Sequence, residues 1–425
     1  MPAPKRLDEK IARMRAGTAT RRDFIIADAK DADMAFGVTA PGPGACLPGR
    51  QHEAQGCWKS LADYREQIRA VIRQDIVDIM LLSASNVEQL AINERLFAGS
   101  PITPAARAND TSDIWVVRGG RYPSLPSRSF RTATIEHMKY GRMQADCAAP
   151  HAGADLGLYS ITFTNNIDWD HRALEDFAAF RLEAEAKRFR YFLEVFNPNV
   201  DPGIKPDAIP GFLNDHIVRT LAGVTSAGRP VFLKIVYHGP RAMEELAQYD
   251  PNLVVGILGG SAGTTYDAFR LIHDAQKYGA RVALFGRKIN NAEHQLAFIE
   301  MLRLITDGKI GPEEAVRAYH GVLQGKGIKP QRSLEEDLKL TDQAMSYDGS
   351  ATKRSTVEVK DNPLAGAKPV STAATPAPAK PAATESSSVP ATDWPKRANG
   401  LPDFDKMTSA QRNAYDASRL KRIFG

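Results

Sequence analysis

A lysine inside an apolar run is the residue of this chain best suited to covalent chemistry. Lys234 lies in the segment Val-Phe-Leu-Lys-Ile-Val-Tyr at positions 231–237. Burying an ammonium group costs several kcal/mol unless the amine is neutral or has a partner. An amine in apolar surroundings can attack a carbonyl carbon and form a Schiff base. The alternative is a structural lysine that pairs with a carboxylate near a strand end.

Two glycine turns follow this lysine and suit the binding of a phosphate group. They read Leu-Gly-Gly-Ser at 258–261 and Phe-Gly-Arg-Lys at 285–288. Glycine lets backbone N–H groups approach a ligand closely, and an arginine can bind a phosphate through two hydrogen bonds. The predicted phosphate-binding residues are Gly259, Gly260, Ser261, Gly263, Gly286, Arg287 and Lys288. For the glycine pair alone, a tight strand-to-helix turn is the alternative.

The elements that must position these residues alternate between short apolar runs and helical patterns. We predict eight strands, at 23–28, 76–83, 101–108, 157–164, 191–196, 231–236, 253–258 and 282–285. Helical spacing of apolar residues predicts helices at 60–74, 169–188, 214–225, 240–249 and 264–277. Eight strands that alternate with helices predict an α/β fold, a (β/α)8 TIM barrel.

The chain divides into a barrel domain and several appended segments. We assign residues 1–20 to a basic N-terminal segment and residues 21–325 to the barrel. Residues 110–155 are too long for an ordinary connection, so we expect an insertion over the strand ends or at an interface. An extra helix is expected within 326–350. The Ala-, Pro-, Ser- and Thr-rich residues 351–395 form a predicted disordered linker.

The final segment, 396–425, carries the pattern of a short amphipathic helix. Thr408 to Gln411 match a capping box, and Ala410, Ala414, Ala417, Leu420 and Phe424 fall on one helical face, with Ile423 alongside. An isolated helix of this length is marginal in water, so we expect it to gain stability by docking. A frayed tail is the alternative.

Composition restricts the function classes. The 425 residues are 43% hydrophobic and 25% charged, with a formal net charge of +5 that lies largely at the two ends, so nucleic-acid binding has weak support. No apolar run is long enough to span a membrane. Three cysteines without a CxxC pair favour a reducing compartment, and we expect a cytoplasmic protein. The scattered histidines predict no metal site, and no cofactor is expected.

The motifs of residues 21–325 resemble those of the class I, Schiff-base aldolase superfamily, which includes deoxyribose-phosphate aldolase, archaeal-type fructose-bisphosphate aldolases and the autoinducer-processing thiolase. In the archaeal-type enzymes the lysine of strand six is followed by a tyrosine and a glycine, which match Tyr237 and Gly239. The Gly-Gly pair after strand seven and the Gly-Arg-Asn-Ile motif after strand eight match Gly259-Gly260 and Gly286-Arg287-Lys288-Ile289.

This resemblance implies a catalytic set. Lys234 would be the nucleophile and Asp28 the acid/base aspartate, whereas we interpret Asp31 and Asp33 as parts of a solvated loop. The family's relay tyrosine after strand five is missing, so Glu194 or Tyr237 is expected to substitute for it. Lys288 stands where the family carries an asparagine, which adds positive charge near the ligand.

The predicted activity is cleavage of a carbon–carbon bond in a small, phosphorylated sugar or keto compound. Alternatives are a phosphosugar isomerase or epimerase, a thiolase, and a non-catalytic scaffold or sensor whose terminal helix binds a partner. The family implies a homo-oligomer. The linker and terminal helix resemble encapsulation peptides of bacterial microcompartments, which would imply a shell or scaffold partner for residues 405–425 and a location inside such a compartment.

Overall fold

The structure is a computed structural model in which the chain forms two compact units, Met1–Ser355 and Thr356–Gly425. It describes residues 4–44, 57–143, 146, 149–260, 263–341, 394–397, 402–403, 406–408, 411 and 415. Among these residues, no helix has the length and apolar character needed to cross a membrane.

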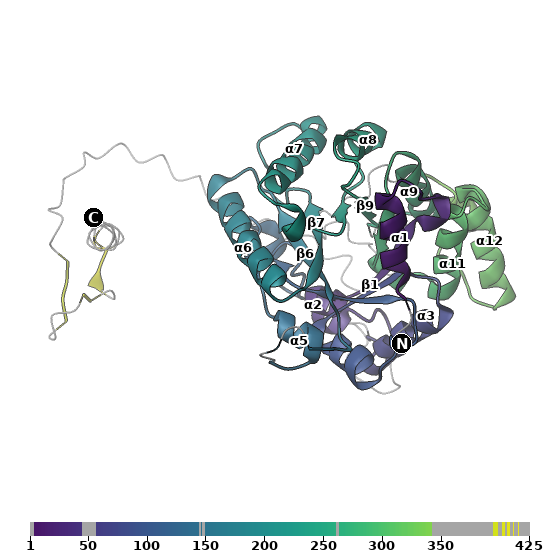
Figure 1. The fold of residues 1–425 in the computed structure, drawn as a ribbon, viewed down its shortest axis with the longest axis horizontal. Coiled ribbons are helices and arrows are strands. Elements are labelled where there is room, and N and C mark those ends of the chain that lie inside the picture. Colours follow the sequence, from purple (N-terminus) through teal and green to yellow (C-terminus); the bar gives the residue numbers. More distant parts are fainter. Residues whose placement is uncertain are drawn as a thin grey trace, which may run out of the picture. The chain divides into compact units, whose positions relative to one another are not determined.

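The first unit is built on a closed barrel of eight parallel strands (Figure 1). In spatial order the strands are β1 (Ile25–Lys30), β10 (Val282–Phe285), β9 (Val255–Leu258), β8 (Leu233–Ile235), β7 (Arg190–Phe196), β6 (Leu156–Thr162), β3 (Thr103–Arg107) and β2 (Ile79–Leu82). All eight predicted strands are present, and the TIM-barrel prediction is confirmed. Two further strands, β4 (Asp110–Thr111) and β5 (Ser129–Phe130), form an antiparallel pair inside the predicted insertion.

Helices surround the barrel. The α-helices are α1 (Arg6–Arg15), α2 (Ala32–Phe36), α3 (Leu61–Gln74), α4 (Ala84–Asn86), α5 (Ile135–Tyr140), α6 (Ile167–Ala186), α7 (Ile209–Ala222), α8 (Pro240–Tyr249), α9 (Thr265–Lys277), α10 (Arg287–Asn290), α11 (Gln295–Thr306), α12 (Pro312–Gly325) and α13 (Leu334–Asp337). Shorter turns are η1 (Arg21–Asp23), η2 (Gly37–Thr39), the π-helical η4 (Val87–Asn93), η5 (Tyr122–Ser124), η6 (Pro206–Ala208) and η7 (Ser226–Gly228).

Capping explains where several helices begin. The hydroxyls of Ser60 and Thr264 accept hydrogen bonds from the backbone N–H groups of Asp63 and Asp267, which complete capping boxes at the starts of α3 and α9. Helix α7 begins five residues earlier than predicted, with a proline in its first turn, where the missing N–H has no cost.

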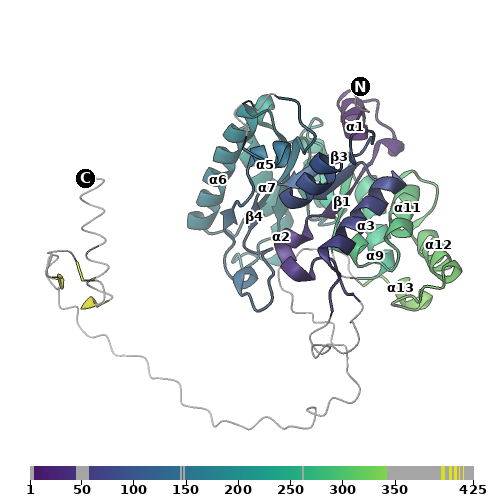
Figure 2. The same ribbon diagram turned by 90° about the horizontal axis from the view of Figure 1, so that it is seen from below.

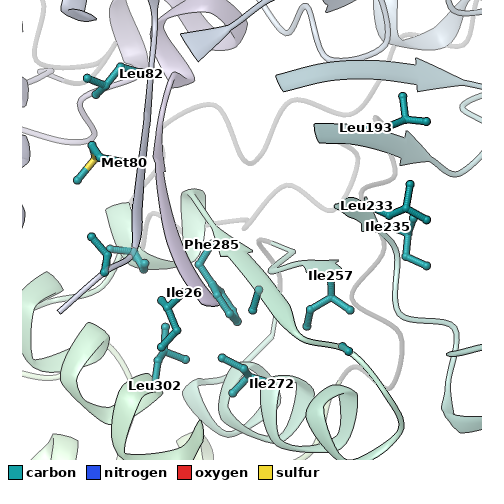
Figure 3. Packing of buried hydrophobic residues seen from close by; sticks show 14 of the residues in the cluster. Ile26, Met80, Leu82, Leu193, Leu233, Ile235, Ile257, Ile272, Phe285 and Leu302 are labelled. Atoms are coloured by element: carbon teal, nitrogen blue, oxygen red, sulfur yellow. The ribbon is translucent and has the colours of Figure 1, made fainter. Parts of the chain in front are cut away.

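The two faces of each strand pack into different clusters. One cluster fills the barrel and includes Ile25, Ala27, Leu81, Phe192 and Phe232. The other lies between the strands and the surrounding helices. Figure 3 shows members of this outer cluster: Ile26 of β1 and Phe285 of β10 lie near Leu302 of α11 and Ile272 of α9. Successive side chains of a strand point to opposite faces. A residue whose neighbours along the strand belong to the outer cluster therefore points into the barrel, and a residue whose neighbours belong to the inner cluster points toward the helices.

The basic N-terminal segment folds as α1 and packs against the barrel. Its Leu7 and Ile11 are buried in the cluster that fills the barrel. Lys10 is buried as well, and its amine donates to Asp78 Oδ2 and Phe24 O, both at 2.9 Å. Arg303 of α11 donates to the same carboxylate oxygen at 2.7 Å. Figure 2 shows α1 and α2 near opposite ends of β1, so α1 covers the end where the strands begin.

The segments that follow the barrel agree only in part with the prediction. The helix expected within 326–350 is α13, which a capping box at Ser333 starts and which spans four residues. Residues 342–350 lie outside the described chain. In the second unit, Thr408 and Gln411 form the predicted capping box, and Gln411 and Tyr415 are helical. The predicted apolar face from Ala410 to Phe424 lies outside the described residues.

One of the three cysteines forms a disulfide, which differs from the expectation of a reducing compartment. Cys57, which precedes α3, is disulfide-bonded. The other two cysteines, Cys46 and Cys147, lie outside the described residues.

Candidate active site

Lys234 and Glu194 form the centre of the site. They are register partners on β8 and β7, and the Lys234 ammonium forms an ion pair and a short contact with Glu194 Oε1. Their neighbours Leu193, Val195, Leu233 and Ile235 belong to the outer cluster, so both charged side chains point into the barrel. Lys234 is 8% exposed and Glu194 only 1%. An amine therefore lies beside a buried carboxylate at the strand ends.

Ser160 and Arg107 extend this pair across the barrel. Ser160 of β6, the register partner of Glu194, donates to Glu194 Oε2 at 2.7 Å. Arg107 of β3 lies 3.9 Å from the same oxygen and donates to Asp31 Oδ2 at 2.5 Å. Burial would lower the pKa of Arg107, but Asp31 and Glu194 raise it above its ordinary value. The arginine is therefore a permanent cation.

A pocket of about 90 Å³ opens beside these residues. Its lining combines Ala29, Asp31, Ala32, Ala35, Phe36, Arg107, Ile114, Glu194, Phe196, Lys234, Leu258, Gly259, Gly260, Leu284, Gly286 and Arg287. Ile114 comes from the insertion and packs with Phe196, Val236 and Leu258. The insertion thus contributes an apolar wall at the carboxyl ends of the strands, where TIM-barrel enzymes carry their active sites.

Four of the predicted phosphate-binding residues line this pocket: Gly259, Gly260, Gly286 and Arg287. A Cβ on Gly259 would lie 2.2 Å from the Phe285 ring, so a larger residue cannot fit without rearrangement. Gly260 has a φ of +60°, which favours glycine. The Arg287 guanidinium lies 5.8 Å from the centre of the Phe36 ring. The backbone of both loops can therefore approach a ligand beside a cation.

Gly263 and Lys288, two further predicted phosphate-binding residues, are not part of the pocket lining. Lys288 points elsewhere: its amine donates to Gly263 O at 2.8 Å, and burial lowers its pKa to about 8. Gly263 has a φ of +83° and precedes α9, where a Cβ would clash with Asp267. The structure thus does not place Lys288 and Gly263 beside the other predicted phosphate-binding residues of this pocket. Ser261 lies outside the described residues.

Asp28 does not meet Lys234. It is fully buried on β1 between Ala27 and Ala29, which face the barrel interior, so its own side chain points toward the helices. There it lies 3.3 Å from the amine of Lys30. Burial raises the pKa of Asp28 and lowers that of Lys30. The acid/base role expected for Asp28 is therefore not supported, because its side chain is on the wrong face of the strand.

Tyr237 also points away from the pocket. It is 5% exposed and belongs to the outer cluster with Met243 and Leu246 of α8. Burial raises the pKa of its hydroxyl above the ordinary value. Of the two residues expected to replace the relay tyrosine, the structure places only Glu194 beside the lysine.

The interpretation of Asp31 and Asp33 as a solvated loop is wrong. Asp31 is 6% exposed, lines the pocket and pairs with Arg107. Asp33 accepts hydrogen bonds from Ser83 at 2.6 Å and Asn86 at 3.1 Å. Arg107 and Ser160 were not predicted as site residues. Arg107 could have been found, because it lies in the apolar run 101–108 as Lys234 lies in the apolar run of its own strand.

Comparisons with known proteins agree with the fold. No protein-family model and no curated protein matches the chain. The structure is similar to that of an archaeal fructose 1,6-bisphosphate aldolase, with a TM-score of 0.50 and 15% identity over 71% of this chain and 99% of that one.

Two other solved aldolases match with lower scores. An archaeal fructose-1,6-bisphosphate aldolase with its catalytic lysine covalently bound to a carbinolamine intermediate has a TM-score of 0.49 and 15% identity, over 71% of this chain and 99% of its own. Deoxyribose phosphate aldolase from Aeropyrum pernix has a TM-score of 0.32 and 12% identity, over 67% and 94%. The similarity to the first of these structures agrees with the predicted TIM-barrel fold.

Proposed function

We propose that this protein is a Schiff-base-forming aldolase that cleaves a carbon–carbon bond in a small, phosphorylated sugar or keto compound. The observation that carries the proposal is the contact between Lys234 and Glu194 inside a pocket at the carboxyl ends of the strands. A nucleophile held beside a general base, which is itself oriented by a third group, here Ser160, is the arrangement that covalent catalysis requires.

Glu194 is the proton carrier in this mechanism. It accepts a proton from the Lys234 ammonium, and the neutral amine adds to the substrate carbonyl to give a carbinolamine. Protonation of the carbinolamine hydroxyl by Glu194 releases water and leaves an iminium ion. A carboxylate within hydrogen-bond contact of the nitrogen can serve both steps without moving.

Bond cleavage then uses the iminium as an electron acceptor. A base removes the proton of the substrate's β-hydroxyl, the adjacent carbon–carbon bond breaks, and the first fragment leaves as an aldehyde. The bonding electrons form an enamine on Lys234. Protonation of the enamine carbon and addition of water release the second carbonyl product and the amine. Asp31 lines the same pocket and is held in place by Arg107, so it can orient or deprotonate the hydroxyl.

The glycine loops provide a place for the substrate phosphate. Gly259 and Gly260 follow β9, and Gly286 and Arg287 follow β10, which are the seventh and eighth barrel strands. Phosphate groups commonly bind at these two loops in TIM barrels. The aldolases reported above are named for phosphorylated sugars, which adds support. Binding energy from the phosphate would position the carbonyl carbon next to Lys234.

Borohydride trapping tests the proposal. The protein is incubated with a panel of phosphorylated aldehydes and ketones, reduced, digested and analysed by mass spectrometry. We expect the mass of a substrate fragment on Lys234 and no adduct in Lys234→Met. Lys309→Met, at an exposed lysine, should trap as well as the wild type. Turnover of a phosphosugar without any adduct would favour an isomerase or epimerase. Turnover of a thioester would favour a thiolase.

We also propose that residues 405–425 act as a docking element and do not take part in chemistry. The capping box at Thr408 and Gln411 supports a helix at this position. Deleting residues 365–425 should leave turnover in solution unchanged and abolish binding to a shell or scaffold protein. A folded truncation that has lost turnover would show that the tail does more than locate the enzyme. Light scattering of both proteins would test the expected homo-oligomer.

A further inference from the structure

A second pocket lies outside the barrel, between α6 and the insertion. Its volume is about 410 Å³, larger than that of the candidate active site. Strand β5, strand β6 and helix α6 contribute its lining, and we call it the outer pocket. Neither the proposed reaction nor the predicted phosphate loops use any of its residues.

Aromatic rings form much of the outer pocket. Phe130, Tyr159, Trp169 and Phe180 all line it. Tyr159 and Phe180 stack with ring centres 4.5 Å apart, and both side chains are buried behind the pocket surface. Trp169 and Phe130 are only partly buried and present their rings nearer to solvent. A flat ring could bind between such walls by stacking.

Three arginines surround these rings. Two of them form ion pairs with carboxylates, and the third has no carboxylate partner among the described residues. Arg131 is paired with Glu183 at 2.5 Å, and Arg172 lies 3.3 Å from Asp176. The Arg128 guanidinium stacks 4.2 Å above Trp169, and in the described part of the chain no carboxylate pairs with it. A stacked guanidinium keeps its N–H edges free to bind a carboxylate or phosphate through two hydrogen bonds.

Two hydroxyl groups add polar contacts deeper in the outer pocket. Tyr159 OH and Ser129 Oγ lie 3.4 Å apart, and both residues line the pocket. Burial raises the pKa of Tyr159 to about 12, so its hydroxyl stays protonated at neutral pH. The hydroxyl can therefore donate a hydrogen bond to a ring nitrogen or oxygen of a ligand.

We propose that the outer pocket binds a small molecule made of a flat ring that carries a phosphate or carboxylate. Trp169 and Phe130 pack against the flat part, Arg128 binds the anionic group, and Tyr159 and Ser129 bind a polar atom of the ring. This combination of contacts selects against ligands that have only the ring or only the charge.

Hydrogen bonds connect the outer pocket with the catalytic carboxylate. Ser129 Oγ accepts a hydrogen bond from Asn109 Nδ2 at 3.1 Å. Asn109 is fully buried and also pairs with the backbone N–H and carbonyl of Ser160, at 2.6 and 2.9 Å. Ser160 donates to Glu194. A ligand that forms new hydrogen bonds with Tyr159 and Ser129 would therefore alter the hydrogen bonds that orient Glu194. Such a ligand would be an effector of the proposed reaction.

Calorimetric titration of the full-length protein tests binding without any assay of turnover. AMP and benzoate should both bind saturably, whereas adenosine and inorganic phosphate should bind at least 10-fold more weakly. Arg128→Ala should weaken AMP binding at least 10-fold. The matched control Arg118→Ala, at an exposed arginine of the same insertion, should bind AMP like the wild type. No saturable binding of either aromatic anion, or unchanged binding in Arg128→Ala, would overturn the site.

A separate measurement tests the connection to Glu194, and this part rests on the proposed function. AMP should change the rate at which borohydride traps an adduct on Lys234. Tyr159→Phe keeps the ring but removes the hydroxyl, so it should still bind AMP and should lose the effect on trapping. Binding of AMP without any change in trapping rate in the wild type would show that the pocket binds its ligand but is not coupled to the barrel.

Discussion

Glu194 and Lys234 lie at the same level of two neighbouring parallel strands, β7 and β8, and their side chains are in contact inside the barrel. Backbone hydrogen bonds between the strands therefore set the separation of the proposed base and the proposed nucleophile. No loop has to close to bring the two groups together. This distinguishes the pair from Gly259, which is in the loop after β9, and from Arg287, which begins the short helix α10.

Replacing Glu194 by glutamine should remove proton transfer while keeping the shape of the side chain. We expect kcat for the cleaved substrate to fall by about 10²- to 10⁴-fold, the usual contribution of a general acid–base. The Ser160→Ala variant, which removes the hydrogen bond to Glu194 and the weaker one accepted from Arg107 at 3.4 Å, should lose less activity. Steady-state kinetics and circular dichroism would measure both variants. Full activity in Glu194→Gln would exclude Glu194 as the proton carrier.

The buried pair of Asp28 and Lys30 should matter for stability and not for chemistry. Lys30→Met leaves the fully buried Asp28 without its cation, and breaking a buried ion pair costs about 3–5 kcal/mol. The double variant Asp28→Leu/Lys30→Met should recover most of this loss. Denaturant unfolding gives the free energies, and Arg73→Ala, at an exposed ion pair, should change stability by less than about 1 kcal/mol. Equal losses in the single and double variants would contradict the pairing.

Asp110 should make stability depend on pH. Burial raises its pKa from 3.8 to about 6, although Arg107 opposes the rise. The folded state therefore binds this proton more tightly than the unfolded state does. The resulting stabilisation is fully present below pH 3.8 and is lost as the pH rises through 6, by up to about 3 kcal/mol at about 1.4 kcal/mol per pKa unit. In Asp110→Asn the unfolding free energy should fall less between pH 4 and 6; an identical slope in both proteins would refute the assignment.

Removing the apolar contacts of α1 should destabilise the barrel. Leu7 has no exposed surface and packs in the cluster inside the strands. Truncating such a leucine to alanine typically costs about 2–5 kcal/mol. Leu7→Ala should therefore lower the thermal midpoint by several degrees in calorimetry. Val38→Ala, at a side chain that is 66% exposed, provides the control. A Leu7→Ala midpoint equal to that of the control would show that α1 does not stabilise the barrel.

Much of the architecture could be predicted because local patterns determine it. Each strand is a short apolar run, each long helix has an apolar stripe, and the number and order of these elements define a TIM barrel. The placement of Lys234, Glu194 and the two glycine loops at the strand ends follows from the same pattern. The boundaries of α7 and α13 could not be read as well, because tertiary packing decides where these helices begin and end.

The direction of individual side chains was harder to predict. Asp28 and Tyr237 each lie one position from a residue that faces inward, and one position along a strand reverses the face. Asp31 is in a segment of alternating charges that reads as a loop, and only the approach of Arg107 from β3 shows why it is buried. The spacing of residues within one segment does not reveal contacts with strands that are distant in the sequence.

Because Glu194 and Lys234 lie on paired strands, the proposed reaction could be directed to new substrates without moving these two residues. The surfaces that would meet the rest of a substrate come from α2, the insertion and α10, which supply Phe36, Ile114 and Arg287. Mutagenesis libraries confined to these three segments could explore new substrates while the reacting pair keeps its alignment. Selection for altered specificity should then yield substitutions in these three segments before any in the barrel strands.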